Sequence, residues 1–301
     1  MPVPRDPLLA ARLRLLGAAA LFSTGPTAIK ACGLGPWQVA GFRSGVAALF
    51  LLATMSDRKR LLRPRLWIVG AAYSGTLVCY ALASKLTTAA NAIFLQSTFP
   101  IYLLLLSPLL LREKVRRGDL LFLVAVMGGM GVLLLGHDTV TAVAADPVRG
   151  NVLSLVSGVL WALTLLGLRW LERDAAGGEG LGHAAVVAGN ALAFLVCLPA
   201  ALPLGPSRAV DWSLILFLGV VQIGISYLLL TRAMGQVSAL EAGLLLMLEP
   251  VLTPLWAWAV HGERPSGWAL AGGAVILGAM VWRTVHQSAT ASEPRLEPPP
   301  A

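Results

Sequence analysis

The sequence predicts an all-α polytopic membrane protein, with ten transmembrane helices arranged as two inverted five-helix repeats. Its 301 residues are 57% hydrophobic and 13% charged, and the mean hydropathy is +0.76. Soluble domains carry about 25% charged residues, so this composition does not supply a water-exposed surface. Apolar runs of roughly 18 or more residues, each able to cross a ~30 Å hydrocarbon core, recur along the chain. A Pro-x12-Glu pattern also occurs twice, 150 positions apart, which indicates a duplicated unit.

The apolar runs lie between charged or Gly/Pro-rich breaks and define ten predicted spans, five on each side of the segment 137–149. Apolar helices of about this length are able to cross a bilayer. The predicted spans are 13–31, 36–55, 66–85, 89–111, 118–136, 150–170, 184–204, 211–230, 239–260 and 267–283.

The fourth and fifth spans of the two halves match without gaps. Pro100 and Glu113 in the first half correspond to Pro250 and Glu263 in the second. Apolar helices match by chance fairly often, so the paired Pro and Glu carry more weight than the other identities. Those identities are Ala83/Ala233, Ala89/Ala239, Ala92/Ala242, Leu95/Leu245, Leu105/Leu255, Leu120/Leu270, Gly128/Gly278 and Met130/Met280.

The duplication predicts one repeat over residues 12–136 and a second over residues 150–283. A Ser-, Pro- and Glu-containing tail over residues 284–301 is predicted to be disordered and cytoplasmic. Because each repeat has five spans, the second copy enters the membrane from the side opposite to the first. Inverted repeats of this kind are typical of secondary transporters.

Basic residues are unequally distributed over the two sides of this arrangement. With the N-terminus in the cytoplasm, 17 of the 23 Lys and Arg residues fall on cytoplasmic segments, five on external ones, and Arg43 within a span. Cytoplasmic loops of membrane proteins are enriched in Lys and Arg. The bias predicts a multi-pass protein of the cell inner membrane with cytoplasmic N- and C-termini. It also explains the net charge of +8 without any binding of nucleic acid.

Pro100 and Pro250 lie inside the predicted fourth and ninth spans. Proline lacks a backbone donor and frees a carbonyl one turn earlier, which kinks the helix. At corresponding positions of two repeats, such interruptions point to a substrate site near the membrane midplane or to a gate. Bending that serves helix packing alone is the alternative.

Glu249 and Glu241 are predicted to lie on the ninth span, Glu249 within the hydrocarbon region. An ionised carboxylate there costs several kcal/mol unless it is paired or faces water. Glu249 is therefore predicted to bind a cationic group of the substrate or a coupling proton, or alternatively to hydrogen-bond a neighbouring helix at the kink. Helical spacing places Glu241, Glu249 and Thr253 on one broad polar stripe.

Arg43 is the other charged side chain inside a predicted span. It is predicted to pair with Glu249 or another acid, and the alternative is a forked contact with a substrate carboxylate. Its neighbours Gly41 and Gly45 form a small-xxx-small pattern that permits close approach of another helix.

Other polar and aromatic side chains recur at helical spacing and are further candidates for a substrate cavity. In a membrane they face the bundle interior, where they line a cavity or hydrogen-bond a neighbouring helix. The candidates are Tyr73, Tyr80, Asn91, Gln96, Thr98, Tyr102, Trp161, Gln222, Ser226 and Trp256, together with Asn190, which stands in the second half where Arg43 stands in the first.

Several of these segments resemble the EamA family of the drug/metabolite transporter superfamily. The resemblance rests on paired five-helix units and on the segments GFRSG at residues 41–45, AANAIFLQSTFPIY at 89–102 and SALEAGLLLMLEPVLTPLWAW at 238–258. It covers roughly residues 12–283, although the sixth and seventh spans match the first and second poorly. The resemblance implies ten helices in two inverted repeats around a central cavity, without a bound cofactor, and it favours export.

The sequence lacks the zinc-protease, serine-hydrolase and P-loop motifs that would indicate an enzyme or an ATP-driven pump. Three widely spaced cysteines indicate neither a disulfide framework nor a metal site. The sequence thus predicts a secondary transporter of small metabolites, such as amino acids, acting as a monomer or homodimer by alternating access. A lipid-modifying membrane transferase and a non-transporting assembly or sensor protein remain the alternatives.

Overall fold

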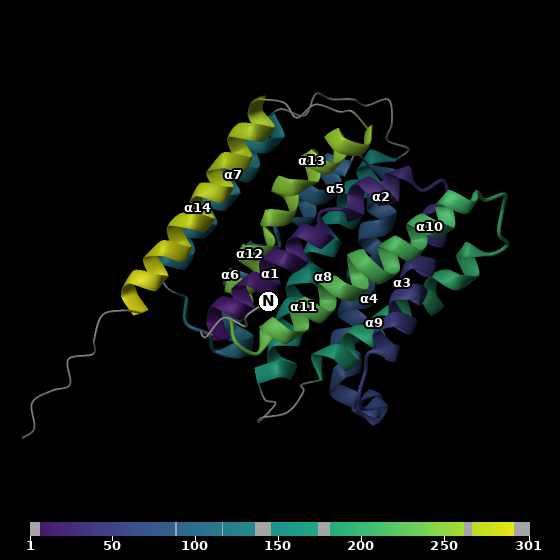
Figure 1. The fold of residues 1–301 in the computed structure, drawn as a ribbon, viewed down its shortest axis with the longest axis horizontal. Coiled ribbons are helices and arrows are strands. Elements are labelled where there is room, and N and C mark those ends of the chain that lie inside the picture. Colours follow the sequence, from purple (N-terminus) through teal and green to yellow (C-terminus); the bar gives the residue numbers. More distant parts are fainter. Residues whose placement is uncertain are drawn as a thin grey trace, which may run out of the picture.

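The computed structural model of the chain describes residues 7–87, 89–115, 117–135, 146–173, 181–261 and 267–291, and these residues form helices and no strand. The helices pack as one bundle, with α7 and α14 side by side along one edge (Figure 1). The elements are α1 (Pro7–Phe22), α2 (Gly25–Ala31), α3 (Pro36–Ala53), η1 (Arg58–Leu62), α4 (Pro64–Leu86), α5 (Ala89–Gln96), α6 (Phe99–Leu111), α7 (Arg117–Leu135), α8 (Pro147–Arg173), α9 (Gly182–Ala201), α10 (Ala209–Phe217), η3 (Leu218–Ile225), α11 (Ser226–Met234), α12 (Ala239–Leu246), α13 (Leu248–His261) and α14 (Gly267–Ala291).

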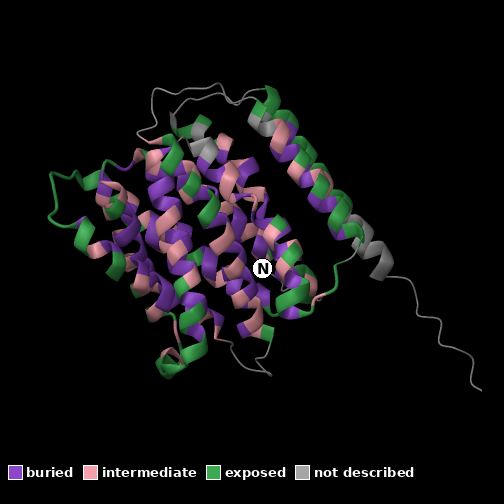
Figure 2. Ribbon diagram, turned by 180° about the vertical axis from the view of Figure 1, so that it is seen from behind, coloured by how far each residue is buried: buried purple, intermediate pink, exposed green. Residues whose placement is uncertain are grey.

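Seven helical segments among the described residues are long and apolar enough to cross a membrane. Buried residues lie in the centre of the bundle and exposed ones along its outer faces and ends (Figure 2). Many of these exposed residues are Leu, Val, Ile and Trp, which suit contact with lipid rather than water. The protein is an all-α polytopic membrane protein. The seven segments are Pro7–Ala31, Pro64–Leu86, Ala92–Leu111, Pro147–Arg173, Gly182–Ala201, Ala209–Met234 and Ala239–Val260.

Helix starts follow local capping signals in the sequence. Pro36 and Pro64 occupy the first positions of α3 and α4, where a missing N–H leaves no hydrogen bond unmade. At the start of α12, the Ser238 hydroxyl accepts a hydrogen bond from the Glu241 backbone N–H at 3.1 Å. Such caps satisfy the donors that the first turn of a helix leaves free, so these starts are set by a few residues.

Two spans are interrupted at corresponding positions of the two halves. One break separates α5 from α6 just before Pro100, and the other separates α12 from α13 at Met247, just before Pro250. Each proline therefore sits in the first turn of a new helix, where it is tolerated, rather than in the middle of a continuous one. A third break, next to Pro26, divides α1 from α2.

The helix contacts of the two halves are reciprocal. α4 packs against α8, the first long helix of the second half, and α11 packs against α1, the first helix of the first half. α3 packs against α9, and α7 against α14. Contacts in which each element meets the counterpart of its partner are expected from two copies related by a twofold axis.

The C-terminal helix is longer than the sequence predicts. α14 continues to Ala291, into the segment 284–301 for which the composition predicts disorder. The remaining residues of that segment lie outside the described part of the chain.

Candidate functional site

A cavity with about 440 Å³ of space unoccupied by atoms lies in the middle of the bundle. Its walls come from α1, α3, α4, α5, α8, η3, α11 and α13, so both halves of the chain contribute. Most of these positions lie several turns from the ends of their spans, which places the cavity near mid-depth. The lining residues are Phe22, Arg43, Thr76, Leu77, Tyr80, Gln96, Trp161, Gln222, Ile223, Tyr227 and Glu249.

Arg43 is 1% exposed and reaches the cavity from α3. Its Nη2 donates a hydrogen bond to the Leu77 carbonyl at 3.1 Å, whereas its Nε has no partner among the described residues. Gly219 of η3 packs closely against α3 at Arg43. A side chain at position 219 would place its Cβ only 2.8 Å from the Arg43 carbonyl oxygen. Close packing and a backbone acceptor thus hold the guanidinium in place.

The predicted pairing of Arg43 with Glu249 is not among the ion pairs of the described residues. Both side chains line the same cavity, but the hydrogen bond to the Leu77 carbonyl supplies the guanidinium with an acceptor instead. A guanidinium and a carboxyl group therefore face one cavity without forming a direct bridge, an arrangement that leaves both available to a ligand or to water.

Three buried polar atoms on cavity residues lack a hydrogen-bond partner in the described part of the chain. They are the Nε of Arg43, the hydroxyl of Tyr80 and the Oε1 of Gln222. An unsatisfied buried polar group costs about 1–3 kcal/mol, so such groups are rare unless a ligand or water completes them. These three atoms are a donor, a hydroxyl and an acceptor on residues that line the cavity, and a small polar molecule bound there can form hydrogen bonds with them.

Glu249 lies in the first turn of α13, directly after the break at Met247, and its half-buried side chain lines the cavity. Gln222, which lines the same cavity, lies in η3, a π-helix of residues Leu218–Ile225. Single π-helical turns inside α-helices occur frequently at functional sites. Gln222 and Glu249, both from the second half of the chain, thus lie in irregular parts of their spans.

Gln96 and Trp161 are the two remaining predicted residues in the cavity wall. The Gln96 Nε2 donates to the Ser157 hydroxyl at 2.8 Å, which fixes its amide against α8. The Trp161 ring meets Phe22 and Tyr227 edge to face, with centroids 6.2 and 6.1 Å apart. Edge-to-face contacts of this kind hold aromatic rings in defined orientations.

Tyr73 and Asn190 lie together beside the cavity rather than in its lining. Asn190 on α9 donates from Nδ2 to the Tyr73 hydroxyl at 3.1 Å, and the Tyr73 ring packs against Tyr227 at an interplanar angle of 52°, with centroids 4.5 Å apart. The pair links α4 to α9 and supports Tyr227 from behind.

The other predicted candidates lie apart from the cavity lining. Thr98 donates to the Leu95 carbonyl at the α5–α6 break, and Ser226 donates to the Val221 carbonyl. Tyr102 is half-buried against the core. The backbone of Asn91 belongs to α5, and its side chain lies outside the described residues.

Trp256 and Glu241 face other surroundings than the sequence predicts. Trp256 is 40% exposed and donates from its ring nitrogen to the Ser23 hydroxyl at 2.8 Å. Glu241 forms an ion pair with Arg12 at 2.9 Å. The predicted stripe through Glu241 and Glu249 assumed one continuous helix, and the break at Met247 ends that register.

The cavity also has walls that the sequence did not single out. Thr76 lies between Tyr73 and Tyr80 at helical spacing, so the periodicity of α4 could have identified it. Tyr227 follows the predicted candidate Ser226 directly. Phe22 and Ile223 are apolar residues in apolar spans, and nothing in the sequence distinguishes them.

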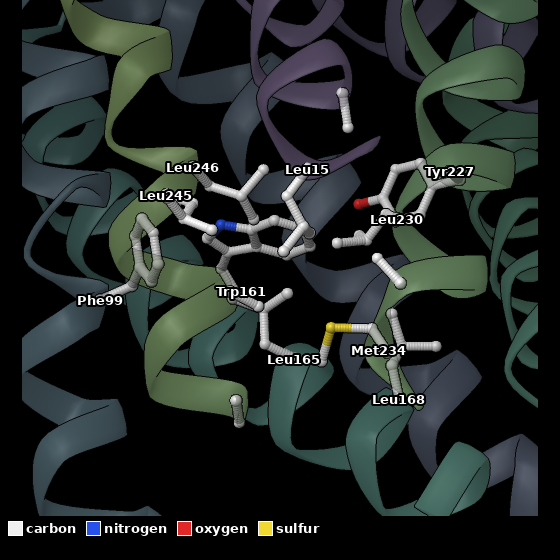
Figure 3. Packing of buried hydrophobic residues seen from close by; sticks show 14 of the residues in the cluster. Leu15, Phe99, Trp161, Leu165, Leu168, Tyr227, Leu230, Met234, Leu245 and Leu246 are labelled. Carbon is white, nitrogen blue, oxygen red and sulfur yellow. The ribbon is translucent and has the colours of Figure 1, made fainter. Parts of the chain in front are cut away.

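A layer of buried apolar side chains from α1, α6, α8, α11 and α12 packs against Trp161 and Tyr227 of the cavity wall (Figure 3). We call it the apolar plug; it comprises Leu15, Phe99, Leu165, Leu168, Leu230, Met234, Leu245 and Leu246, packed around Trp161 and Tyr227. All of these residues are buried. On α1, α8 and α11, four plug residues lie between a cavity residue and a charged residue of the same helix: Leu15, Leu165, Leu168 and Leu230. The plug therefore lies on the side of the cavity that faces this end.

The charged end beyond the plug is held together by ion pairs. Arg169 donates to Glu113 at 2.9 Å, and the second Glu113 oxygen accepts from the Ala239 backbone N–H at 3.1 Å. Arg169 also donates to the Met234 carbonyl. We call this the basic end, defined by Arg12, Arg14, Arg60, Arg169 and Arg232.

Comparison with known proteins follows the same division into two halves. The sequence model of the EamA-like transporter family matches residues 10–135 and again residues 148–284. The chain belongs to the EamA-like transporter family. It is therefore a membrane transporter with a small-molecule substrate, and the transferase alternative falls away because the family is one of transporters.

Two curated relatives align with most of this EamA-family chain. An uncharacterized transporter of Archaeoglobus fulgidus is 25% identical over 268 residues, covering 84% of this chain and 89% of the relative. A pseudopaline exporter of Pseudomonas aeruginosa is 27% identical over 251 residues, covering 81% of this chain and 84% of the relative. A solved crystal structure of a chain that is 22% identical aligns with 94% of this chain and includes 99% of the other chain, with a TM-score of 0.76. This likeness supports the fold.

Proposed function

We propose that this EamA-family transporter exports a small amphipathic metabolite, such as an amino acid or a related compound, across the inner membrane by alternating access. The observation that carries the proposal is the central cavity, where unsatisfied polar atoms of Arg43, Tyr80 and Gln222 converge with the Glu249 carboxylate from both halves of the chain. The substrate binds there, and rocking of the halves exposes it to each side in turn.

The proposed architecture is ten spans in two inverted repeats, residues 12–136 and 150–283, with both termini in the cytoplasm. The reciprocal packing of α4 on α8 and of α11 on α1 supports a twofold relation between the repeats. The paired breaks before Pro100 and Pro250 supply two joints at which the halves can bend. The basic end faces the cytoplasm because Lys and Arg accumulate on that side.

The cavity chemistry supports a substrate that carries both polar and apolar groups. Arg43 suits a carboxylate, Glu249 suits a cationic group or a coupling proton, and Phe22, Trp161 and Tyr227 supply apolar walls. Export is the proposed direction, and one relative of the chain is itself named as an exporter. No cofactor is required by this scheme, which uses the substrate gradient or a proton gradient.

The test begins with a metabolite comparison between cells with and without the protein, followed by uptake of the leading compounds into proteoliposomes. Glu249→Gln removes the titratable group from the cavity while keeping its shape. We expect transport to fall about tenfold or more and to lose its dependence on pH, because the variant neither pairs a cationic group nor carries a proton.

Asp146→Asn, which changes an acid at the surface outside the cavity, is the matched control and should transport at the wild-type rate. A Glu249→Gln variant with the wild-type rate and pH profile would remove Glu249 from the mechanism. Absence of transport for every accumulated metabolite would contradict the proposed function itself.

A further inference from the structure

A second cavity, with about 1020 Å³ of space unoccupied by atoms, opens at the basic end. It lies between the start of α1, the end of α3, η1, the end of α8, the start of α9 and the end of α11. Its charged and hydroxyl-bearing walls include Arg14, Arg60, Arg232, His183, Thr54 and Glu172. We call it the basic pocket. It does not share residues with the central cavity.

Two of its three arginines are not engaged by the described part of the protein. Arg14 on α1 and Arg232 on α11 have no hydrogen bond or ion pair with any described residue. Arg60 forms a long ion pair with Asp57 at 3.7 Å, and the Asp57 carboxylate is half exposed. Positive charge therefore gathers on a concave surface, where low-dielectric walls strengthen its attraction for anions.

The wall contains one acid, Glu172, against three arginines. One Glu172 oxygen accepts a hydrogen bond from the Gly182 backbone N–H at 2.8 Å, at the start of α9. That contact ties the carboxylate to the first turn of a helix, where a negative charge is favourable. Next to Gly182, the His183 ring lies 3.0 Å from the Leu51 carbonyl and 3.4 Å from the Thr54 hydroxyl.

The pocket is adjacent to the apolar plug. Arg14 precedes the plug residue Leu15, and Thr231 of the pocket follows Leu230 of the plug. The same helices α1, α8 and α11 thus carry the central cavity, then the plug and then the basic pocket along their length. A ligand in the pocket would stand at the closed mouth of the central cavity.

We propose that the basic pocket binds an anionic group, a carboxylate or a phosphate, held by Arg14 and Arg232 with Arg60 at the rim. Guanidinium groups bind both anions through paired, charge-assisted hydrogen bonds. The anion belongs either to a soluble metabolite or to the headgroup of an anionic lipid, which basic pockets between membrane helices also bind. In the first case the pocket collects substrate before the plug opens, and that role rests on the transport function proposed above.

Inorganic phosphate is the probe, and the full-length protein is held in phosphatidylcholine nanodiscs at constant ionic strength. The midpoint of thermal unfolding, measured against phosphate concentration, gives an apparent Kd without any need for transport. We expect saturable stabilisation of the wild type. In the double variant Arg14→Gln/Arg232→Gln the apparent Kd should rise about tenfold or more, because two charge-assisted contacts are lost.

Arg58→Gln is the matched control, since it removes an exposed cation from η1, next to the pocket but outside its wall. Its Kd should stay within about twofold of the wild type if local contacts rather than general surface charge bind the anion. Arg14→Lys/Arg232→Lys keeps both charges and should retain saturable binding, which separates loss of the site from loss of folding.

Repeating the titration in phosphatidylglycerol nanodiscs identifies the source of the anion. Loss of the phosphate response in the wild type would assign the site to a lipid headgroup, and an unchanged response would assign it to soluble anions. The same apparent Kd for wild type and the Arg14→Gln/Arg232→Gln variant, or no saturable response in the wild type, would overturn the proposal. Neither result depends on whether a transported substrate has been found.

Discussion

The two ends of the bundle differ in the side chains that pack between the central cavity and the outside. Toward the basic end lies the apolar plug, made of leucines, methionine and large aromatic rings and backed by the Arg12–Glu241 and Arg169–Glu113 ion pairs. Toward the opposite end lies a smaller buried cluster that contains Ala28, Cys32, Val39, Ala83 and Ala92 together with Ile29, Leu34, Tyr80, Ile215 and Leu218.

This difference indicates which end opens more easily. Exposing apolar surface to water costs about 25 cal/mol per Å², so separating large side chains is more costly than separating alanines. Breaking a partly buried ion pair adds to that cost. The structure is thus closed most firmly at the basic end, and the proposed export requires the substrate to offset the cost of opening it.

The largest expected effect comes from shortening a plug side chain. Leu230→Ala should destabilise the protein by about 3 kcal/mol, because it leaves a cavity in a closely packed layer. It should also admit a membrane-impermeant thiol reagent from the basic end to a cysteine introduced at Thr76 in the cavity wall. Thermal unfolding in nanodiscs and the labelling rate measure the two effects.

Ile215→Ala is the matched variant at the opposite end, where Ile215 is equally buried. It should cost a similar amount of stability, since the loss of packing is alike, without increasing access from the basic end. If both variants raised access from the basic end equally, the plug would have no special role.

A smaller effect is expected at the Arg169–Glu113 pair. Glu113→Gln removes the charge that faces Arg169 and weakens the bond to the Ala239 N–H. Both side chains are partly exposed, so we expect a loss of about 2 kcal/mol rather than the full cost of a buried charge. The unfolding midpoint in nanodiscs measures it.

The comparison for this pair is Asp211 at the opposite end, where it bonds Arg208 at 3.0 Å and the Gly33 N–H at 2.7 Å. Asp211→Asn should lower the unfolding midpoint less than Glu113→Gln does, because Arg208 is largely exposed to solvent. A greater loss of stability for Asp211→Asn than for Glu113→Gln would contradict the expectation that the basic end is held closed more firmly.

Much of the helical framework was accessible from sequence because the membrane limits the possibilities. Lipid requires every backbone group to be satisfied within a helix, so apolar runs predict helices directly. Kinks at Pro100 and Pro250 were also predictable, since proline removes a hydrogen bond within its own helix. Arg43, Gln222 and Glu249 stood out as polar residues in apolar spans, and all three line the cavity.

Other features depend on contacts between distant segments, and the sequence did not reveal them. Arg43 donates to a backbone carbonyl of another helix. Every residue carries such a carbonyl, so the sequence does not identify this partner. The π-helix at Gln222 changes the register of its span without a proline or another local signal. Glu241 was placed on the cavity stripe because the break at Met247 was not anticipated, and its ion pair with Arg12 joins residues far apart in the chain.

The most direct test measures from which end of the bundle a reagent reaches the central cavity. Thr76→Cys places a thiol in the cavity wall, in a background where Cys32, Cys79 and Cys197 are replaced by serine. Vesicles of opposite orientation then present either end of the substrate-free protein to an impermeant maleimide. Labelling is expected from the end opposite the basic end, and protection is expected from the basic end. Faster labelling from the basic end would contradict this expectation.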